Sequence, residues 1–408
     1  MAVNLKAPDA ASLLAIDGVE LGLTHAGIRK VARPDLMLMR LAAGAVTAGV
    51  FTQNSFAAAP VQVCREVLAG GGEVRALVVN AGNANCGTGA AGMEAARRSC
   101  EAVARLLGVQ AKEVLPFSTG VILEPLPVEK LVAALPACVS SLSPSNWGAA
   151  AEAIMTTDTV AKAFSRLVEI DGTRVKITGI AKGVGMLAPN MATMLTFIAT
   201  DASVARTALQ AMVREVADVS FNRVTVDGDT STNDSFILTA TATAKNPEIA
   251  VGTAQYAALR DAIAEVAIHL AQSIARDGEG ATKFITIEAV GARDEAEALR
   301  VARGIAHSPL VKTAFFASDP NLGRLLMAIG NAGVQAMDTS KVNLWLGNVR
   351  VIENGGRAAS YLEEDGARVM KPAEIVVKVD LGRGTAATTV WTCDYSYDYV
   401  KINAEYRT

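Results

Sequence analysis

The run from Lys182 to Leu195 combines the residue types that a self-cleaving nucleophile needs. It reads Lys-Gly-Val-Gly-Met-Leu-Ala-Pro-Asn-Met-Ala-Thr-Met-Leu, so glycines and a proline precede an Ala192-Thr193 step. A Thr that follows a small residue on a flexible segment can attack its own preceding peptide bond. Thr is a weak nucleophile, but as a chain terminus it gains a base, its α-amino group, whose pKa lies near ~8. Cleavage between Ala192 and Thr193 would therefore create both nucleophile and base.

Part of the same run matches a nucleotide-binding pattern. Gly183 to Ala188 fits G-x-G-x-x-A after a strand-like segment. That pattern holds a pyrophosphate only where it opens a helix, whereas residues 189–200 have strand character and no acidic residue follows in a second strand. The match therefore gives little support to a nucleotide site.

Asp227 to Asp234 resembles the start of a calcium-binding loop. Thr232 stands where that loop needs Gly, and Leu238 stands where it needs Glu, so both geometric demands fail. We expect a polar turn between two strands, whose side-chain oxygens could also line a polar active site.

Ser118-Thr119-Gly120 lies where a strand is expected to end. A Thr hydroxyl beside a Gly N–H can direct two donors at one oxygen, as an oxyanion hole requires. An ordinary turn is the alternative, since Ser, Thr and Gly are common turn formers. The polar stretch Asn80 to Asn85 leaves a similar choice between a backbone nest for anions and a loop.

Glu279 lies between two glycines at the expected end of a helix. Glycine neighbours let other backbone approach closely, which suits a ligand site, but a solvated loop is the plainer interpretation. The chain ends on the polar stretch Asn403 to Thr408, which follows a structured-looking segment and could contribute to a site.

The elements that must position these residues alternate between strands and helices. Apolar alternation and buried runs predict strands over residues 46–51, 75–79, 114–122, 174–180, 194–199, 282–290, 342–352 and 375–381, and the alternation continues over 388–400. Helical periodicity predicts helices over residues 89–107, 204–219, 256–275 and 319–332, the last capped by Ser318 or Asp319. We expect an α/β protein with mixed sheets layered with helices, and no linker marks where its lobes divide.

Length and composition indicate a compact protein with balanced charge. A chain of 408 residues favours two or three sub-domains, and 51% hydrophobic residues supply ample core. The 38 basic and 41 acidic residues give a net charge of −3. Because nucleic acids and anionic membranes call for a clustered basic surface, we expect neither as a partner.

The cysteines and histidines support neither disulfides nor a metal site. Five cysteines without a CxxC pair indicate reduced thiols, and three histidines lie far apart in the sequence. The start of the chain lacks the apolar stretch of a signal peptide, and no run of 18 apolar residues occurs. We therefore expect a cytoplasmic protein.

Together with further blocks in the same order, the run from Lys182 to Leu195 resembles the self-cleavage signature of the bifunctional ornithine acetyltransferase / N-acetylglutamate synthase family of arginine biosynthesis. The other blocks are Asn80 to Asn85, Ser118 to Ile122, Ile154 to Thr159, Val226 to Ser235, Asp277 to Gly280, Ser318 to Asn321 and Asn403 to Thr408. Val184, Leu187 and Leu322 depart from the residues expected at their positions, which affects packing more than chemistry.

The resemblance implies a role for nine residues. Thr193 would be the nucleophile released by cleavage after Ala192, and Thr119 and Gly120 would form the oxyanion hole. Thr156, Lys182, Thr193, Glu279, Asn403 and Thr408 are similar to the family's substrate-contacting positions. The implied fold is the family's own α/β type, related to self-processing aminopeptidases.

The implied activity is acetyl transfer from N2-acetyl-L-ornithine to L-glutamate through an acetyl-Thr193 intermediate, without metal or cofactor. Acetyl-CoA is a further possible co-substrate. Cleavage would give an alpha chain of residues 1–192 and a beta chain of residues 193–408, which associate in the family as an α2β2 tetramer. One alternative is a self-processing aminopeptidase or amidase that passes the acyl group to water. The other is an α/β binding protein in which Ala192-Thr193 is merely part of a strand.

Overall fold

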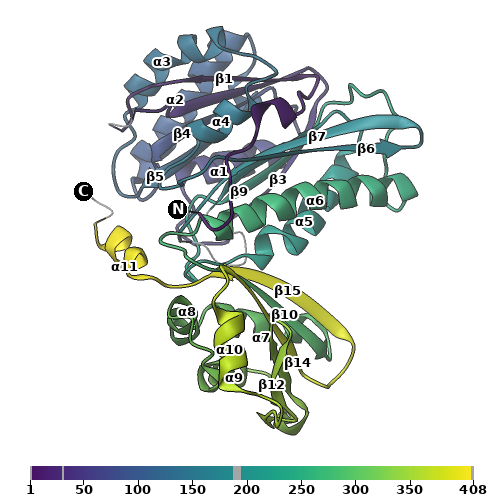
Figure 1. The fold of residues 1–408 in the computed structure, drawn as a ribbon. Helices are drawn as coiled ribbons and strands as arrows, with labels where there is room; N and C mark the ends of the chain where they lie inside the picture. The colour runs from purple at the N-terminus through teal and green to yellow at the C-terminus, as the bar shows by residue number, and fades with distance from the viewer. Residues whose placement is uncertain (1, 30–31, 187–193, 406–408) are drawn as a thin grey trace. The chain divides into compact units, whose positions relative to one another are not determined.

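The computed structural model describes residues 2–29, 32–186 and 194–405, which divide into two compact units (Figure 1). The larger unit comprises Ala7–Asn222 and Asp229–Ile274. The smaller unit comprises the chain up to Lys6, Arg223–Gly228 and the chain from Ala275 onward. None of the helices in the described ranges has the length and apolar character that a membrane crossing requires.

The first sheet of the larger unit has four strands in the order β1-β2-β4-β5. They are β1 (Val19–Thr24), β2 (Leu36–Leu41), β4 (Ala76–Asn83) and β5 (Val114–Val121). β4 and β5 are parallel, and the other pairs are antiparallel. β2, β4 and β5 are almost continuously buried, as expected for strands covered on both faces. Asn80–Asn83 and Ser118–Gly120 therefore end neighbouring parallel strands.

The second sheet of the larger unit has five strands in the order β3-β9-β8-β7-β6. They are β3 (Val46–Phe51), β6 (Lys162–Ile170), β7 (Thr173–Lys182), β8 (Leu195–Thr200) and β9 (Ser235–Ala240). β7 and β8 are antiparallel, with Lys182 opposite Leu195 at the end of the pair. The segment that holds Ala192-Thr193 therefore connects two adjacent strands of one sheet.

Helices cover the outer face of each sheet, and two further helices, the first and fourth in the chain, contact strands of both sheets (Figure 1). The helices are α1 (Ala59–Ala69), α2 (Gly89–Leu107), α3 (Val128–Ser140), α4 (Trp147–Ala153), α5 (Arg206–Val219) and α6 (Ala254–Arg276). α2 and α3 pack on the first sheet, and α5 packs on β3 and β9 of the second. Between the sheets, Phe117 of β5 meets Phe197 of β8 edge to face with 5.0 Å between ring centroids. This apolar layer holds the two sheets together.

The smaller unit is built on a six-stranded mixed sheet in the order β13-β12-β11-β14-β10-β15. Its strands are β10 (Phe284–Ala292), β11 (Asn343–Leu346), β12 (Val349–Glu353), β13 (Gly356–Arg357), β14 (Glu374–Asp380) and β15 (Ala386–Cys393). Its helices are α7 (Glu295–Ala306), α8 (Pro309–Phe316), α9 (Leu322–Gly330), α10 (Glu363–Met370) and α11 (Tyr397–Ala404). Residues of β14 alternate between exposed and buried, so one face of this sheet carries the core.

Most predicted elements are confirmed, including the fold class and the bounds of β3 and α2. Three details were wrong. Residues 342–352 form the hairpin β11–β12 instead of one strand, because Gly347 turns the chain with a φ of +54°. Asn321, rather than Ser318 or Asp319, caps α9 by accepting the N–H of Arg324. The alternation over 388–400 ends as a strand at Cys393, and Ser396 then caps α11.

The two units do not correspond to the two chains that cleavage would produce. β7 and β8 lie on either side of Ala192-Thr193 in the sequence and pair within the same sheet. Cleavage there would leave the sheet's hydrogen bonds intact.

Candidate active site

Lys182 brings two of the predicted site residues together in the larger unit. It is the last residue of β7, and its Nζ donates to Thr156 Oγ1 over 2.8 Å and to Thr119 Oγ1 over 3.2 Å. Thr119 lies near the end of β5 and Thr156 follows α4, so three separate parts of the chain converge. The side chain of Lys182 is only 4% exposed, which makes this contact part of the interior and not of the surface.

The direction of these hydrogen bonds leaves the threonine hydroxyl protons available. An ammonium group has donors and no acceptor, so both hydroxyl oxygens accept from Lys182. Each hydroxyl hydrogen must then point to some other atom. Thr119 can therefore donate to an oxyanion while its own oxygen is held in place by Lys182, as a preorganised donor requires.

Asp158 is a buried carboxylate that anchors this cluster. Its Oδ1 accepts from Lys162 Nζ over 2.7 Å and from the N–H of Gly183 over 2.8 Å. Its Oδ2 accepts the N–H of Thr156 over 3.1 Å and lies 3.9 Å from Lys182 Nζ. Asp158 therefore contacts Lys182, which is the last residue of β7, and Gly183, which follows it. It also contacts the loop that carries Thr156.

The charge of Asp158 is stabilised by its neighbours. Burial alone acts to raise its pKa, but the charges of Lys162 and Lys182, with hydrogen bonds from Lys162 and Gly183, outweigh that effect. The pKa of Asp158 is consequently held well below its ordinary value. The guanidinium of Arg33 fixes the same loop from the other side by donating to the carbonyls of Met155 and Thr156, each over 2.7 Å.

Gly120 is required by the close approach of β5 to β4. Its φ is +134°, and a Cβ there would lie 2.2 Å from the carbonyl carbon of Gly82. The β4–β5 pairing shifts register at Gly82 and Asn83. A side chain at position 120 would therefore collide with backbone, so the predicted oxyanion pair Thr119-Gly120 lies at an irregularity that only Gly allows.

Buried amide side chains hold the backbone beside Thr119. Asn233 Nδ2 donates to the carbonyls of Ser118 and Ala84 over 2.8 and 2.7 Å. Asn80 Oδ1 accepts from Ser118 Oγ over 2.6 Å, and Asn80 Nδ2 donates to the carbonyl of Asn83. The stretch Asn80 to Asn85 is therefore a structural support for the end of β5.

Asp234 lies at the other end of the segment between β7 and β8. It is fully buried, and its Oδ1 accepts the N–H of Met194 over 3.1 Å. Burial raises the pKa of Asp234 well above its ordinary value, although hydrogen bonds from Met194 and Ser231 and the charge of Lys182 act in the opposite direction. Asp158 and Asp234 thus hold the two ends of this segment with pKa values shifted in opposite directions.

In the smaller unit, Glu279 and Asn403 form a direct pair. Asn403 Nδ2 donates to Glu279 Oε2 over 2.9 Å. Glu279 is buried, so the expectation that it lies in a solvated loop was wrong. Asn403 belongs to α11, whose N-terminal cap Ser396 also donates to the carbonyl of Gly280 over 2.6 Å. A Cβ on Gly280 would lie 2.5 Å from the backbone nitrogen of Tyr399, so this glycine lets α11 approach Glu279.

The chain between β15 and α11 is fixed by buried charged groups. Asp394 accepts the N–H groups of Thr282 and Lys283, each over 2.8 Å. The buried Lys312 donates to Thr392 Oγ1 over 2.8 Å and to the carbonyl of Cys393, and lies 4.6 Å from the centre of the Tyr395 ring. These contacts determine where α11, and with it Asn403, begins.

The predicted site residues fall into two described groups. Thr119, Gly120, Thr156 and Lys182 lie together in the larger unit, and Glu279 and Asn403 pair in the smaller unit. Ala192, Thr193 and Thr408 lie outside the described residues.

Sequence reasoning gave no role to three residues that organise these groups: Arg33, Asp158 and Lys162. Of Asn233 and Asp234 it said only that the polar stretch from Asp227 to Asp234 could line an active site. The spacing of Asp158 and Lys162, four residues apart in a polar stretch before a strand, was the available signal. Asp227 to Asp234 does not join two strands as expected, since a 3-10 helix at Phe221–Arg223 comes before it and β9 follows.

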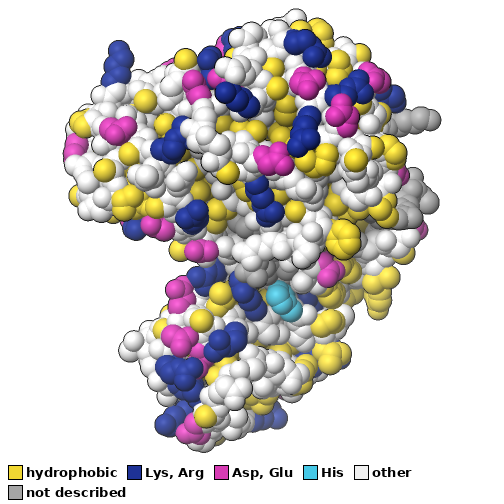
Figure 2. Space-filling view, turned by 180° about the vertical axis from the view of Figure 1, so that it is seen from behind, with side chains coloured by type: hydrophobic (Ala, Val, Ile, Leu, Met, Phe, Trp, Pro, Cys, Tyr) yellow, Lys and Arg dark blue, Asp and Glu magenta, His cyan; other side chains and the backbone are white. Residues whose placement is uncertain are grey.

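The described residues contain no group of metal ligands, and the face in Figure 2 shows no patch of one charge sign. No group of three or more His, Cys, Asp or Glu side chains there has an arrangement that could hold a metal ion. On the face in Figure 2, acidic and basic side chains are interspersed instead of gathered by sign.

Comparisons with known proteins point to one family. The model of the ArgJ family matches residues 20–408. An arginine biosynthesis bifunctional protein from Bacillus halodurans is 36% identical over 50% of this chain and 95% of its own, with a TM-score of 0.48. An ornithine acetyltransferase from Mycobacterium tuberculosis, solved with ornithine, is 32% identical over 46% of this chain and 98% of its own, with a TM-score of 0.37. An L-aminopeptidase D-Ala-esterase/amidase from Ochrobactrum anthropi is 12% identical over 67% of this chain and 88% of its own, with a TM-score of 0.41.

Proposed function

The chain belongs to the ArgJ family, and from this membership we propose that it transfers the acetyl group of N2-acetyl-L-ornithine to L-glutamate through an ester on Thr193. The observation that carries the proposal is the position of Lys182. Its Nζ joins Thr119 and Thr156 at the strand end from which the segment with Thr193 departs. Three residues expected to handle substrate thus meet in the fold although they lie far apart in the sequence.

The first step is cleavage of the chain. The Oγ of Thr193 attacks the carbonyl carbon of Ala192, and the acyl group moves from nitrogen to oxygen. Water then hydrolyses the ester, leaving a carboxylate on Ala192 and a free α-amino group on Thr193.

The second step is acetyl transfer. Thr193 Oγ attacks the acetyl carbonyl and the α-amino group accepts the hydroxyl proton. Thr119 and Gly120 donate to the oxyanion of the tetrahedral intermediate, which collapses to acetyl-Thr193 and protonated ornithine amine. The amine of glutamate then attacks the ester, giving N-acetylglutamate and restoring Thr193. Because ornithine leaves before glutamate reacts, the kinetics should be ping-pong.

The remaining residues suit the charges of the two amino acids. Lys182 supplies a buried positive charge for a substrate carboxylate, and Glu279 supplies a carboxylate for the side-chain ammonium of ornithine. Asn403 holds Glu279 in the described structure, and Thr408 and the rest of the tail would add polar groups. The chemistry moves an acetyl group between two amines, so the chain's own groups suffice for it.

The decisive experiment is incubation of the protein with N2-acetyl-ornithine and glutamate, with and without acetyl-CoA, while N-acetylglutamate is measured. Product without acetyl-CoA supports the proposal, and its absence would defeat the ornithine acetyltransferase assignment. Product from acetyl-CoA and glutamate alone would establish a second, synthase activity.

Cleavage is tested on a denaturing gel. Wild type should give two fragments of roughly 20 and 22 kDa from the 42.3 kDa chain. Thr193→Ala should remain one inactive band, whereas Thr207→Ala, a change at an exposed position of α5, should be cleaved as wild type is. A single wild-type band would count against self-cleavage. Native mass spectrometry of the cleaved protein tests the α2β2 assembly.

The alternative function is hydrolysis by a self-processing aminopeptidase or amidase. The same assay separates the two, since acetate released without N-acetylglutamate would identify water as the acceptor.

A further inference from the structure

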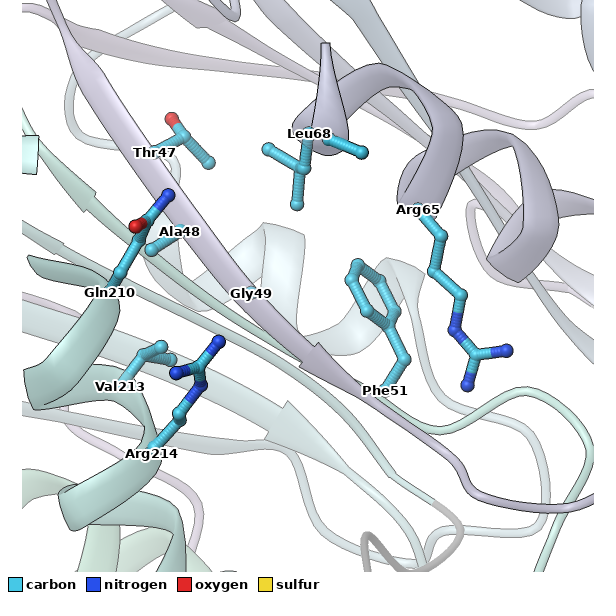
Figure 3. Close-up of a pocket in the computed structure, with 10 residues that line it drawn as sticks. Thr47, Ala48, Gly49, Phe51, Arg65, Leu68, Gln210, Val213 and Arg214 are labelled. Atoms are coloured by element: carbon cyan, nitrogen blue, oxygen red, sulfur yellow. The ribbon is translucent and has the colours of Figure 1, made fainter. Parts of the chain in front are cut away.

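A groove on the larger unit combines an open strand edge with two arginines. It is lined by β3, α1 and α5, through Thr47, Ala48, Gly49, Phe51, Arg65, Leu68, Ala69, Gln210, Val213 and Arg214. Its volume is about 260 Å³. Figure 3 shows β3 passing between the two helices, with Arg214 directed towards the strand from α5 and Leu68 directed towards it from α1. We call this feature the β3 groove.

The charge of the groove is positive. Two of its lining residues are arginines and none is acidic. The acidic neighbours of these arginines have other partners. Glu66 pairs with Arg97 over 3.3 Å, and Glu215 accepts from Tyr256 Oη over 2.9 Å. Asp218, one turn after Arg214 on α5, accepts from Asn222 Nδ2 over 2.8 Å. A ligand in the groove would therefore meet guanidinium groups without competing carboxylates.

The two arginines differ in whether their guanidinium groups already have a hydrogen-bond acceptor. Arg65 donates to the carbonyl of Thr52, which holds its side chain beside Phe51. Arg214 makes no hydrogen bond or ion pair with the described part of the chain and is exposed on α5. Its guanidinium can therefore donate two parallel N–H hydrogen bonds to an oxyanion, because the planar guanidinium matches the geometry of a carboxylate or phosphate.

The floor of the groove is the free edge of β3. β3 is the first strand of its sheet and pairs on one side with β9. Thr52 N donates to the carbonyl of Asp234 on the β9 side, so the alternation of an antiparallel pair turns the N–H and C=O groups of Thr47, Gly49 and Phe51 outward. Gly49 is half-buried, and a Cβ there would lie 2.6 Å from Ile237 Cδ1 and 3.1 Å from Phe51 Cζ, so this glycine lets both side chains pack against β3. The groove thus offers backbone N–H donors between two guanidinium groups.

Size limits the ligand to a small molecule. A cavity of about 150 Å³ holds benzene, so about 260 Å³ accommodates roughly ten non-hydrogen atoms. Leu68, Phe51 and Val213 add apolar surface beside the cations.

We propose that the β3 groove is a binding site for a small oxyanion, a carboxylate or phosphate monoester carried on a compact apolar group. The anion would meet Arg214 and the backbone of β3, with Arg65 at its side, and the apolar group would pack on Leu68 and Phe51. Neither Lys182 nor Thr119 lines the groove, so this proposal does not depend on the proposed acetyl transfer.

Direct binding tests the proposal with benzoate and phenyl phosphate as probes and benzamide as the neutral control. Isothermal titration calorimetry and ligand-observed NMR on the full protein should give saturable binding of at least one anion, and benzamide should bind at least tenfold more weakly. Added salt should weaken anion binding, because the guanidinium groups are exposed. The better of the two anions identifies whether carboxylate or phosphate is preferred.

Variants then assign the binding to the groove. Arg214→Gln should raise the Kd of the anion at least tenfold and Arg65→Gln should raise it to a smaller extent. Arg105→Gln, a matched change of an exposed arginine on α2, should leave it unchanged. Gln210→Trp keeps both arginines and fills the groove, so it should abolish binding.

Two results would overturn the proposal. One is that neither benzoate nor phenyl phosphate binds saturably. This result would also overturn the proposal if a second copy of the chain were found to occupy the groove. The other is equal affinity in Arg214→Gln and Arg105→Gln, which would place the bound anion elsewhere.

Discussion

Asp158 and Gly183 are joined by a 2.8 Å hydrogen bond from the backbone N–H of Gly183 to an oxygen of the Asp158 carboxylate, whose side chain is fully buried. The same carboxylate binds Lys162 and lies beside Lys182. One negative charge thus fixes the start of the segment that contains Thr193 and balances two buried lysines. In the proposed mechanism Asp158 would be a positioning residue, because its contacts are with Lys182 and Thr156, which are proposed to meet the substrate.

Asp158→Asn should therefore cost about 3 kcal/mol of unfolding free energy, because it leaves two buried ammonium groups without their counter-charge. Urea unfolding followed by circular dichroism measures this. Asp261→Asn is the matched control, since Asp261 is 66% exposed in its pair with Arg260 and should cost less than about 0.5 kcal/mol. Equal effects of the two changes would show that the buried cluster contributes little.

Asp234→Asn should become relatively more stable than wild type as the pH rises. Burial raises the folded pKa of Asp234, so its favourable contribution is complete below the ordinary value near ~3.9 and is lost as the pH rises through the folded pKa. An amide imitates the protonated carboxyl and does not titrate. Urea unfolding at pH 4, 5.5 and 7 tests this trend.

Asp158 provides the opposite trend as an internal comparison. Its folded pKa is depressed, so its contribution is present above the ordinary value near ~3.9 and is lost only as the pH falls below it. The cost of Asp158→Asn should therefore stay constant between pH 5.5 and 7. A constant difference between Asp234→Asn and wild type over the same range would contradict the assignment for Asp234.

The sequence predicts elements well where periodicity is local, and less well where tertiary contacts decide. The helix over 89–107 is marked by its apolar spacing and by Gly108, which takes a left-handed conformation at its end. In contrast, the approach of Lys182 to Thr156 depends on three elements packing together, which no local pattern contains. The end of the β15 strand at Cys393 also escapes local analysis, because Asp394 and Lys312 fix it through contacts with distant residues.

Removing the hydroxyl of Thr119 should slow acetyl transfer. Thr119→Val keeps the shape and deletes the donor, so kcat for N-acetylglutamate formation should fall on the order of a hundredfold, which corresponds to about 3 kcal/mol for one oxyanion donor. Thr119→Ser retains the hydroxyl and should stay within about tenfold of wild type. If Thr119→Val and Thr119→Ser had the same rate, the hydroxyl would not be the donor.

Gly120→Ala should lower the stability of the larger unit by more than the usual cost of placing Ala at a residue with a positive φ. The added Cβ would lie 2.2 Å from the carbonyl carbon of Gly82, so the β4–β5 pairing must move. Gly172→Ala is the control, because Gly172 also has a positive φ, +77°, with no atom within 4 Å of its added Cβ. Thermal unfolding should show about 1 kcal/mol for Gly172→Ala and clearly more for Gly120→Ala. Similar losses would mean that β5 can shift without cost.

Exchanging the side chains of the Glu279–Asn403 pair should distinguish the role of the pair in holding α11 from the proposed role of the Glu279 carboxylate in binding ornithine. Asn403→Asp places a second carboxylate where Asn403 Nδ2 now donates to Glu279 over 2.9 Å, so α11 should loosen and its amides should exchange faster at pH 7. Glu279→Gln combined with Asn403→Asp restores one donor and one acceptor, and amide exchange in α11, followed by mass spectrometry, should return towards wild type. Acetyl transfer should stay impaired in the double variant, because the carboxylate proposed to meet ornithine has moved from position 279 to 403. Recovery of both exchange protection and KM for N2-acetyl-ornithine would show instead that only the pairing matters.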